Sequence, residues 1–243
     1  YLALALVPLL AMSVTFILVA RRATSDLVRK ELEGVARIQQ KRLEYRMRQT
    51  YDRLAQVQSR TMLRQAMAEY KATPSAASLE EIESSLRGAT ASLADFRNMS
   101  VLDNNGNVIA STRDSDIGKN LSSSKPFKAG AGEPDISVFF RRPDGGLGEY
   151  LVGPMMLDGT KLGVLVIESS AEDLIDLVKD YTGLGRTGET IVAEETPEGT
   201  ARFLGAPRSG RHEVLETVVP RTKSNIPINM ALDRKTALVS GVD

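Results

Sequence analysis

The sequence predicts an α+β protein in which a membrane-spanning helix and a long stalk helix precede an antiparallel five-stranded sheet with flanking helices. Three observations predict this fold: an uncharged apolar segment opens the chain, a helical repeat of apolar residues follows it, and short β-prone segments separated by turn residues begin at Phe96. We therefore expect a transmembrane helix at 1–21, a stalk helix and a second helix at 22–94, a sheet module at 95–181, and the start of a second, incomplete module at 182–243.

The segment Leu2–Ala20 is apolar enough to predict a membrane anchor. It contains no charged residue, and as a helix it would span about 28 Å, close to the ~30 Å hydrocarbon core of a bilayer. Arg21 and Arg22 end it. Two alternatives remain: a cleaved signal peptide, which needs a shorter apolar stretch and a cleavage site of small residues, and a buried soluble helix.

Residues 22–71 predict one long amphipathic helix. The segment has no proline and a single glycine, and its apolar residues recur mostly at steps of three and four: Val28, Leu32, Val35, Ile38, Met47, Tyr51, Leu54 and Val57. A helix of this length cannot bury its apolar stripe alone, so we expect it to pack on its own domain, on a second copy in a homodimer, or on both. Thr73 and Pro74 end it, and Ser78 with Glu81 predicts a capping box for the second helix.

Charge is distributed unevenly although the net charge is zero. Residues 21–71 hold 13 Lys and Arg against 6 Asp and Glu, whereas residues 72–243 hold 18 against 25. A basic helix beside a bilayer either approaches anionic headgroups or presents a solvated face. Positive residues that follow a spanning helix usually stay in the cytoplasm, so this charge opposes the extracytoplasmic location that we predict for the rest of the chain.

Strands and turns alternate from Phe96 onward. We predict strands at 96–102, 107–111, 136–141, 149–156 and 161–168, a hairpin turn at 103–106, a short helix around 125–131 and a closing helix at 171–181. Further strands at 190–195 and 201–205 begin the second module, which does not complete its sheet before Asp243.

The composition excludes several kinds of site. Because the chain has no cysteine, it forms no disulfide, thiolate metal site or cysteine nucleophile, and a single histidine, His212, excludes a multi-histidine metal site. Gly183–Gly188 matches G-x-G-x-x-G, but a helix precedes it and a strand follows it, the reverse of a dinucleotide-binding unit. We therefore expect no cofactor, no metal, no nucleic-acid partner and no catalytic site within this chain.

The order of the segments resembles the double-Cache extracytoplasmic sensor region of bacterial transmembrane receptors. The stretches that carry the resemblance are VLDNNGNVIAST, DIGKNLSSSKPFKAG, GEYLVGPMMLDGTKLGVLVIESSAEDLIDLV, GLGRTGETIVAEE and the terminal GVD, within residues 22–243. The resemblance implies a PAS-like sheet, small-molecule sensing in the membrane-distal module, and a location at the bacterial inner membrane. It also implies that ligand binding shifts helix packing and controls a cytoplasmic output domain, such as that of a histidine kinase, a chemoreceptor or a diguanylate cyclase.

The resemblance also implies a ligand pocket over the sheet, with four candidate residues. Phe127 would line the cap, Arg141 would pair with a ligand carboxylate, Tyr150 would donate a hydrogen bond, and Glu168 would hold a ligand amine. Each has a structural alternative: a core aromatic for Phe127, a solvated turn for Arg141, and an exposed strand end for Glu168. Amino-acid-binding members carry a tryptophan that this chain lacks, so an organic acid, an amine or no ligand stays open.

Two other functions fit the same sequence. One is a membrane-anchored structural or protein-interaction domain without a small ligand, in which Arg141, Tyr150 and Glu168 would be exposed or point apart. The other is a cytoplasmic PAS-like module behind the anchor, which the basic stalk favours.

Overall fold

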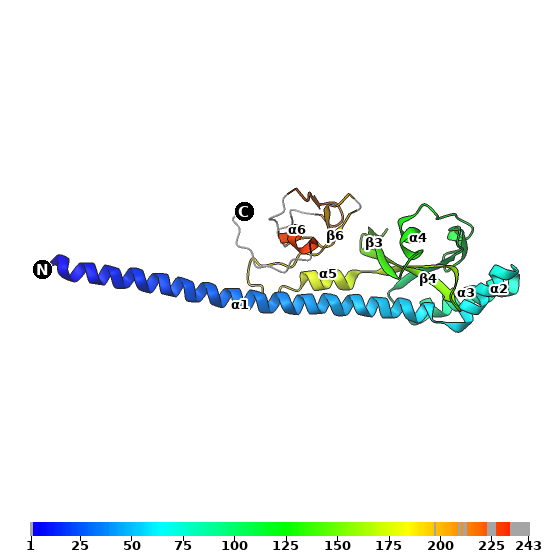
Figure 1. Ribbon diagram of the computed structural model, residues 1–243, viewed down its shortest axis with the longest axis horizontal. Coiled ribbons are helices and arrows are strands. Elements are labelled where there is room, and N and C mark those ends of the chain that lie inside the picture. Colours follow the sequence, from blue (N-terminus) through cyan, green and yellow to red (C-terminus); the bar gives the residue numbers. More distant parts are fainter. Residues whose placement is uncertain (1, 197, 209, 211–212, 223–226, 234–243) are drawn as a thin grey trace.

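The computed structural model describes residues 2–196, 198–208, 210, 213–222 and 227–233, including their side chains except those of residues 2–11 and 137. His212 and the terminal GVD segment lie outside the described residues. One long helix, α1 (Leu2–Gln58), runs along the molecule, with the main sheet beside one of its ends and a smaller group of strands closer to its middle (Figure 1).

The stalk is interrupted where the sequence predicts a continuous helix. Helix α1 ends at Gln58, Arg60 has an extended backbone, and α2 (Thr61–Ala72) continues in a new direction. After this break, α2 buries Leu63 and Met67 in the cluster that also contains residues of α3 and of the sheet. The prediction of one helix over residues 22–71 is therefore wrong at this point.

None of the helices in the described part of the chain carries an apolar stretch long enough to cross a membrane.

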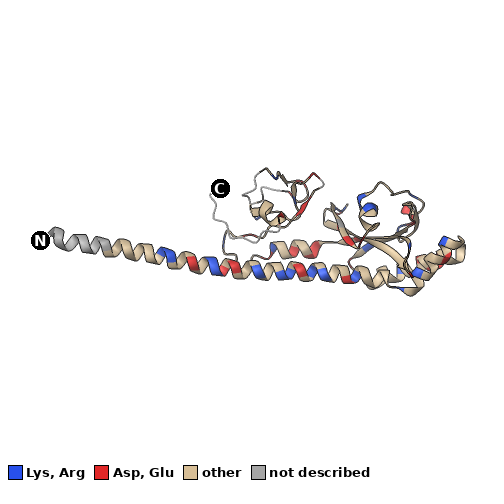
Figure 2. Ribbon diagram, in the orientation of Figure 1, with Lys and Arg blue, Asp and Glu red and all other residues tan. Residues whose placement is uncertain are grey.

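Charged residues of both signs alternate along the exposed part of α1 (Figure 2). Arg29 and Glu33 form an ion pair one helical turn apart, and both side chains are about half exposed. Such an arrangement is typical of a solvated helix face.

The third helix, α3 (Ala76–Ser92), begins one turn earlier than predicted. Ser75 is its N-cap residue, because the Oγ atom of Ser75 accepts a hydrogen bond of 3.1 Å from the backbone N–H of Ser78. The predicted capping box at Ser78 and Glu81 is wrong, since Ser78 already lies in the first turn of the helix and its hydroxyl donates to the carbonyl of Ser75.

The main sheet is antiparallel, with the strand order β2-β1-β5-β4-β3. Its strands are β1 (Phe96–Leu102), β2 (Val108–Ser111), β3 (Asp135–Arg141), β4 (Leu147–Leu157) and β5 (Thr160–Ser170). The 3-10 helix η1 (Asp114–Asp116) and α4 (Lys125–Gly130) lie between β2 and β3, and α5 (Glu172–Lys179) follows β5. The predicted α+β class with an antiparallel sheet is confirmed.

The predicted hairpin turn joins β1 to β2. One carboxylate oxygen of Asp103 accepts hydrogen bonds of 2.8 Å from the backbone N–H groups of Asn105 and Asn107. Gly106 has a φ of 82°, and a Cβ atom there would lie 2.6 Å from the backbone of Ser122. Glycine therefore satisfies both the turn geometry and the close approach of the following loop.

The two faces of the sheet pack against different elements. On the face toward α1, α2 and α3, the buried residues of the sheet include Met99, Val101, Leu151, Leu165 and Ile167. The opposite face packs Leu102, Val152, Val164 and Val166 under Phe127 of α4. Successive strand residues point to opposite faces, so β1, β4 and β5 carry residues of both sets.

A smaller sheet follows, with the strand order β6-β7-β8. Its strands are β6 (Ala193–Glu195), β7 (Ala201–Phe203) and β8 (Val218–Val219), and α6 (Pro227–Leu232) lies beyond them. The strand predicted at 190–195 begins later, at Ala193, and the strand predicted at 201–205 ends at Phe203.

An ion pair between Arg42 of α1 and Asp180 ties the end of α5 to the stalk. Hydrogen bonds from Thr182 and Arg42 lower the pKa of Asp180 from 3.8 to about 2. Because the folded-state pKa is below the usual value, the carboxylate stabilises the fold above about pH 4, and this contribution is lost as the pH falls toward 2. We expect the denaturant midpoint of the wild type to exceed that of Asp180→Asn at pH 6, and the difference to shrink on acidification. An equal difference at pH 6 and pH 2 would contradict this assignment.

Candidate functional site

A row of polar side chains crosses the α4 side of the main sheet. Tyr150 of β4 pairs in register with Glu168 of β5, and Glu168 pairs with Asn98 of β1. Tyr150 packs against the apolar cluster under α4, which places the row on that face. The sheet therefore brings together Tyr150 and Glu168, two of the four predicted site residues.

Ion pairs extend the row onto the segment after β2. Arg113 donates one hydrogen bond to Glu168 (Nη2 to Oε2, 3.0 Å) and a longer one to Asp116 (Nη1 to Oδ2, 3.4 Å). Asp116 also accepts from the amide of Asn98 at 3.2 Å and from the ammonium of Lys119 at 2.7 Å. Two carboxylates thus face two cations. A ligand group of either charge would therefore have a partner of opposite charge here.

Buried hydroxyls fix the orientation of Asn98 at the inner end of the row. The Oδ1 atom of Asn98 accepts hydrogen bonds from Ser111 at 3.1 Å and from Thr112 at 2.8 Å. Ser111 is in turn linked to Ser100 by a buried contact of 2.9 Å between their hydroxyls. With Oδ1 held by these two hydroxyls, the Asn98 amide directs its N–H₂ group toward Asp116.

Tyr150 is a neutral phenol in this environment. Burial raises its pKa, and the nearby carboxylate of Glu168 raises it further. Its ring stacks on Phe140 of β3, with centroids 4.5 Å apart and an interplanar angle of 24°. The stacked ring is held in place, so the phenol is able to donate a hydrogen bond at physiological pH.

A cavity of about 410 Å³ lies between β3 and the smaller sheet, and its wall does not include Asn98, Glu168 or Tyr150. Its wall includes Val138, which pairs in register with Tyr150, and Lys125 at the start of α4. Glu194 and Arg202 of the smaller sheet, which form an ion pair, line the other side. The volume suits a small organic molecule.

Phe127 closes the apolar end of the same face. Its side chain is 9% exposed and packs with Val152, Val164 and Val166. Helix α4 approaches the sheet closely, since a Cβ atom at Gly130 would lie 2.8 Å from the side chains of Val152 and Val164. This position agrees with the core role and is also next to the row, so ligand contact by Phe127 stays a prediction.

Arg141 does not join the other three predicted residues. Its guanidinium donates to the backbone carbonyl of Val214 at 3.0 Å and lies 3.6 Å from Glu216. The guanidinium that contacts Glu168 belongs instead to Arg113, which the sequence did not single out. The spacing of Arg113, Asp116 and Lys119 after a predicted strand is the signal that could have pointed to this group.

The chain matches, over residues 28–204, the family described as the double sensory domain of two-component sensor kinases. It belongs to this family. The prediction of a double sensory region is therefore confirmed, and sensing is the function of the domain. No curated protein matches the sequence.

Solved structures similar to this double sensory domain are distant in sequence. The sensor domain of the Vibrio cholerae histidine kinase DctB is 20% identical with a TM-score of 0.47, over 60% of this chain and 59% of that one. The ligand-binding domain of the Pseudomonas fluorescens chemoreceptor CtaA, in complex with L-valine, is 16% identical with a TM-score of 0.40, over 69% and 74%. The sensory domain of the Campylobacter jejuni chemoreceptor Tlp3, with isoleucine bound, is 14% identical with a TM-score of 0.39, over 67% and 72%. The chain spans about three fifths of the length of the Vibrio cholerae structure.

Proposed function

We propose that this double sensory domain binds a small organic acid or amine beside the row formed by Asn98, Glu168 and Tyr150, as the extracytoplasmic part of a bacterial transmembrane receptor. The observation that carries the proposal is the pairing of Arg113 with Glu168 next to a neutral, immobilised phenol. A ligand carboxylate would take Arg113 and the hydroxyl of Tyr150, whereas a ligand amine would take Glu168 and Asp116. A carboxylate that takes Arg113 would compete with Glu168 for the guanidinium, and an amine that takes Glu168 and Asp116 would compete with Arg113 and Lys119.

The same proposal includes a membrane anchor, a homodimer and a cytoplasmic output domain. Residues 1–21 anchor the chain in the inner membrane, which the uncharged segment Leu2–Ala20 supports. Exposed apolar side chains on α1, among them Leu27, Ile38 and Tyr45, support contact with a second copy in a homodimer. Binding in the module formed by 95–181 changes the packing of the helices and thereby controls a cytoplasmic output domain, such as a histidine kinase.

The ligand-free alternative makes a different prediction for the site. As a purely structural domain, the chain would leave Arg141, Tyr150 and Glu168 exposed or pointing apart, and Arg141 does point away from the other two, toward Val214. The side chain of Glu168 is 12% exposed and pairs with Arg113, and Tyr150 is its cross-strand neighbour. This arrangement supports the sensing function over the structural one.

Binding is tested with the purified chain and a panel of short carboxylic acids and primary amines, followed by thermal shift and calorimetry. For an amine that binds, we expect Glu168→Gln to weaken affinity by about tenfold or more, because it removes the carboxylate that takes the ammonium group. For an acid that binds, we expect Tyr150→Phe to weaken affinity by a similar factor, because it removes the hydroxyl that donates to the ligand carboxylate. Arg141→Gln is the matched control and should leave affinity within about twofold, since its contacts lie at Val214 and Glu216. Equal losses for all three variants, or no binder in the panel, would count against the proposal.

Topology is tested separately with a periplasmic reporter joined after residue 180. Reporter activity outside the cytoplasm is expected for the extracytoplasmic sensor. A reporter that is produced but inactive would instead support the PAS-like module behind the anchor.

A further inference from the structure

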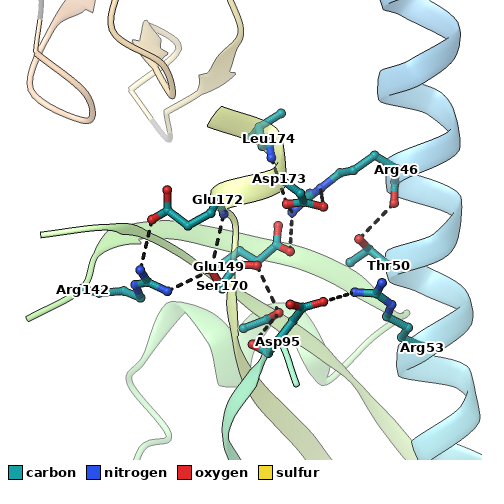
Figure 3. A network of polar contacts seen from close by, with 11 residues as sticks. Arg46, Thr50, Arg53, Asp95, Arg142, Glu149, Ser170, Glu172, Asp173 and Leu174 are labelled. Atoms are coloured by element: carbon teal, nitrogen blue, oxygen red, sulfur yellow. Dashed lines mark hydrogen bonds and ion pairs between the residues drawn. The ribbon is translucent and has the colours of Figure 1, made fainter. Parts of the chain in front are cut away.

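An ion cluster joins the stalk to the sheet on the face opposite the candidate site (Figure 3). Arg46 of α1 donates to Glu149 of β4 (Nη2 to Oε1, 2.6 Å), and two of its nitrogens contact Asp173 of α5 at 3.1 Å. The side chains of Arg46 and Glu149 are 8% and 2% exposed. One residue of α1 thus holds a central strand and the closing helix at the same time.

Burying this ion cluster costs free energy, because its charged groups lose their contact with water. Within the described part of the chain, the second carboxylate oxygen of Glu149, Oε2, is buried and has no hydrogen-bond partner. Burial raises the pKa of Glu149, and Arg46 opposes that effect. A buried ion pair is often replaceable by apolar residues without loss of stability, so a cluster with an unsatisfied oxygen points to a role other than stability.

The position of Glu149 connects this cluster to the candidate site. Glu149 and Tyr150 are consecutive in β4, so their side chains lie on opposite faces of the sheet. Their cross-strand partners in β5 are Ser169 and Glu168, which are divided between the two faces in the same way. A change in the twist of β4 and β5 at the row of polar residues would therefore move Glu149 on the other face, because packed strands shift as units.

We propose that Arg46 and Glu149 are the positioning residues that transmit a change at the Tyr150–Glu168 row to the stalk helix α1. This inference rests on the proposed sensing site, whose response it carries. Two other ion pairs hold α1 but are more exposed: Arg42 with Asp180, and Arg53 with Asp95. Solvent screens such pairs and leaves them loosely coupled, so they hold α1 without relaying movement from β4.

The test uses hydrogen–deuterium exchange of the full chain, with a mutation in place of a ligand. Glu168→Gln removes one charge from the row and should change the exchange rate of α1 amides between residues 43 and 53 by about threefold or more in the wild-type background. In the Glu149→Gln background the response of these exchange rates should fall below about 1.5-fold, because the ion pair with Arg46 is lost. In the Arg53→Gln background, which removes an exposed pair from the same helix, the full response should persist.

A general loss of stability would not produce this pattern, because the readout is the response to Glu168→Gln and not the basal rate. If Glu149→Gln does not fold, Asp173→Asn serves in its place, since that carboxylate is 56% exposed and its loss should reduce the response by about half. No response in the wild-type background, or an equal response in the Glu149→Gln and Arg53→Gln backgrounds, overturns the inference. Binding of the acid and amine panel is measured independently, so a failed relay and a failed binding site give different results.

Discussion

Replacing Arg46 by alanine is expected to lower the free energy of unfolding by about 3–5 kcal/mol, the largest effect that we predict for a single substitution in this chain. The variant leaves the carboxylate of Glu149 buried in the sheet without its ion-pair partner. It also releases Asp173 from α1, so the closing helix loses its contact with the stalk at this position. Urea unfolding followed by circular dichroism measures the effect.

Two comparisons make this expectation specific. Arg53→Ala removes the exposed pair with Asp95 and should cost about 1 kcal/mol or less. The loss in Arg46→Ala should also be smaller at about pH 4 than at pH 7, because a carboxyl group with a raised folded-state pKa favours the folded state as the pH falls. A cost for Arg46→Ala no greater than that for Arg53→Ala would show that the buried cluster is energetically unimportant.

Phe127→Ala is expected to destabilise the domain by about 3 kcal/mol, the second largest effect. The ring fills the space between α4 and the side chains of Val152, Val164 and Val166, and its removal leaves a cavity that the tightly packed helix cannot close. Phe127→Leu, which keeps most of the apolar volume, should cost about 1 kcal/mol.

The same variant distinguishes two kinds of contribution from Phe127. If the ring only packs α4, Phe127→Leu should retain the affinity for a bound panel member. If the ring also lines the cap, that affinity should fall by about tenfold while stability is nearly preserved. A free energy of unfolding unchanged in Phe127→Ala would contradict the packing described for α4.

The positions of the strands and of the closing helix along the chain were predictable because local pattern and burial agree in them. Segments such as Lys161–Glu168 are continuous apolar runs bounded by turn residues, and both faces of β5 are indeed buried. The break after Gln58 was not predictable in the same way. No glycine or proline marks it, and apolar residues continue across it; what accompanies the break is the packing of Leu63 and Met67 with α3 and the sheet.

Of the residues in the candidate site, only those on strands could be predicted from the sequence. Tyr150 and Glu168 lie together because strand register places them opposite each other. Arg113 and Asp116 belong to a segment whose path depends on the whole module, and no local periodicity indicates that it folds back over β5. Arg141 lies one residue beyond Phe140 on β3, and the end of the strand directs it toward residues 214–216, away from the row.

The uninterrupted path of α1 has a consequence for how a signal would leave the sensor. Between Arg46 and Arg21 the helix has no break, and it covers about 38 Å at 1.5 Å per residue. A helix without a break rotates as one body. A small rotation of α1 about its own axis at Arg46 therefore produces the same rotation at Arg21. Inserting one residue between them would advance the phase by about 100° and lengthen the helix by only about 1.5 Å. Rotation and displacement along the axis can therefore be varied almost independently in this stalk.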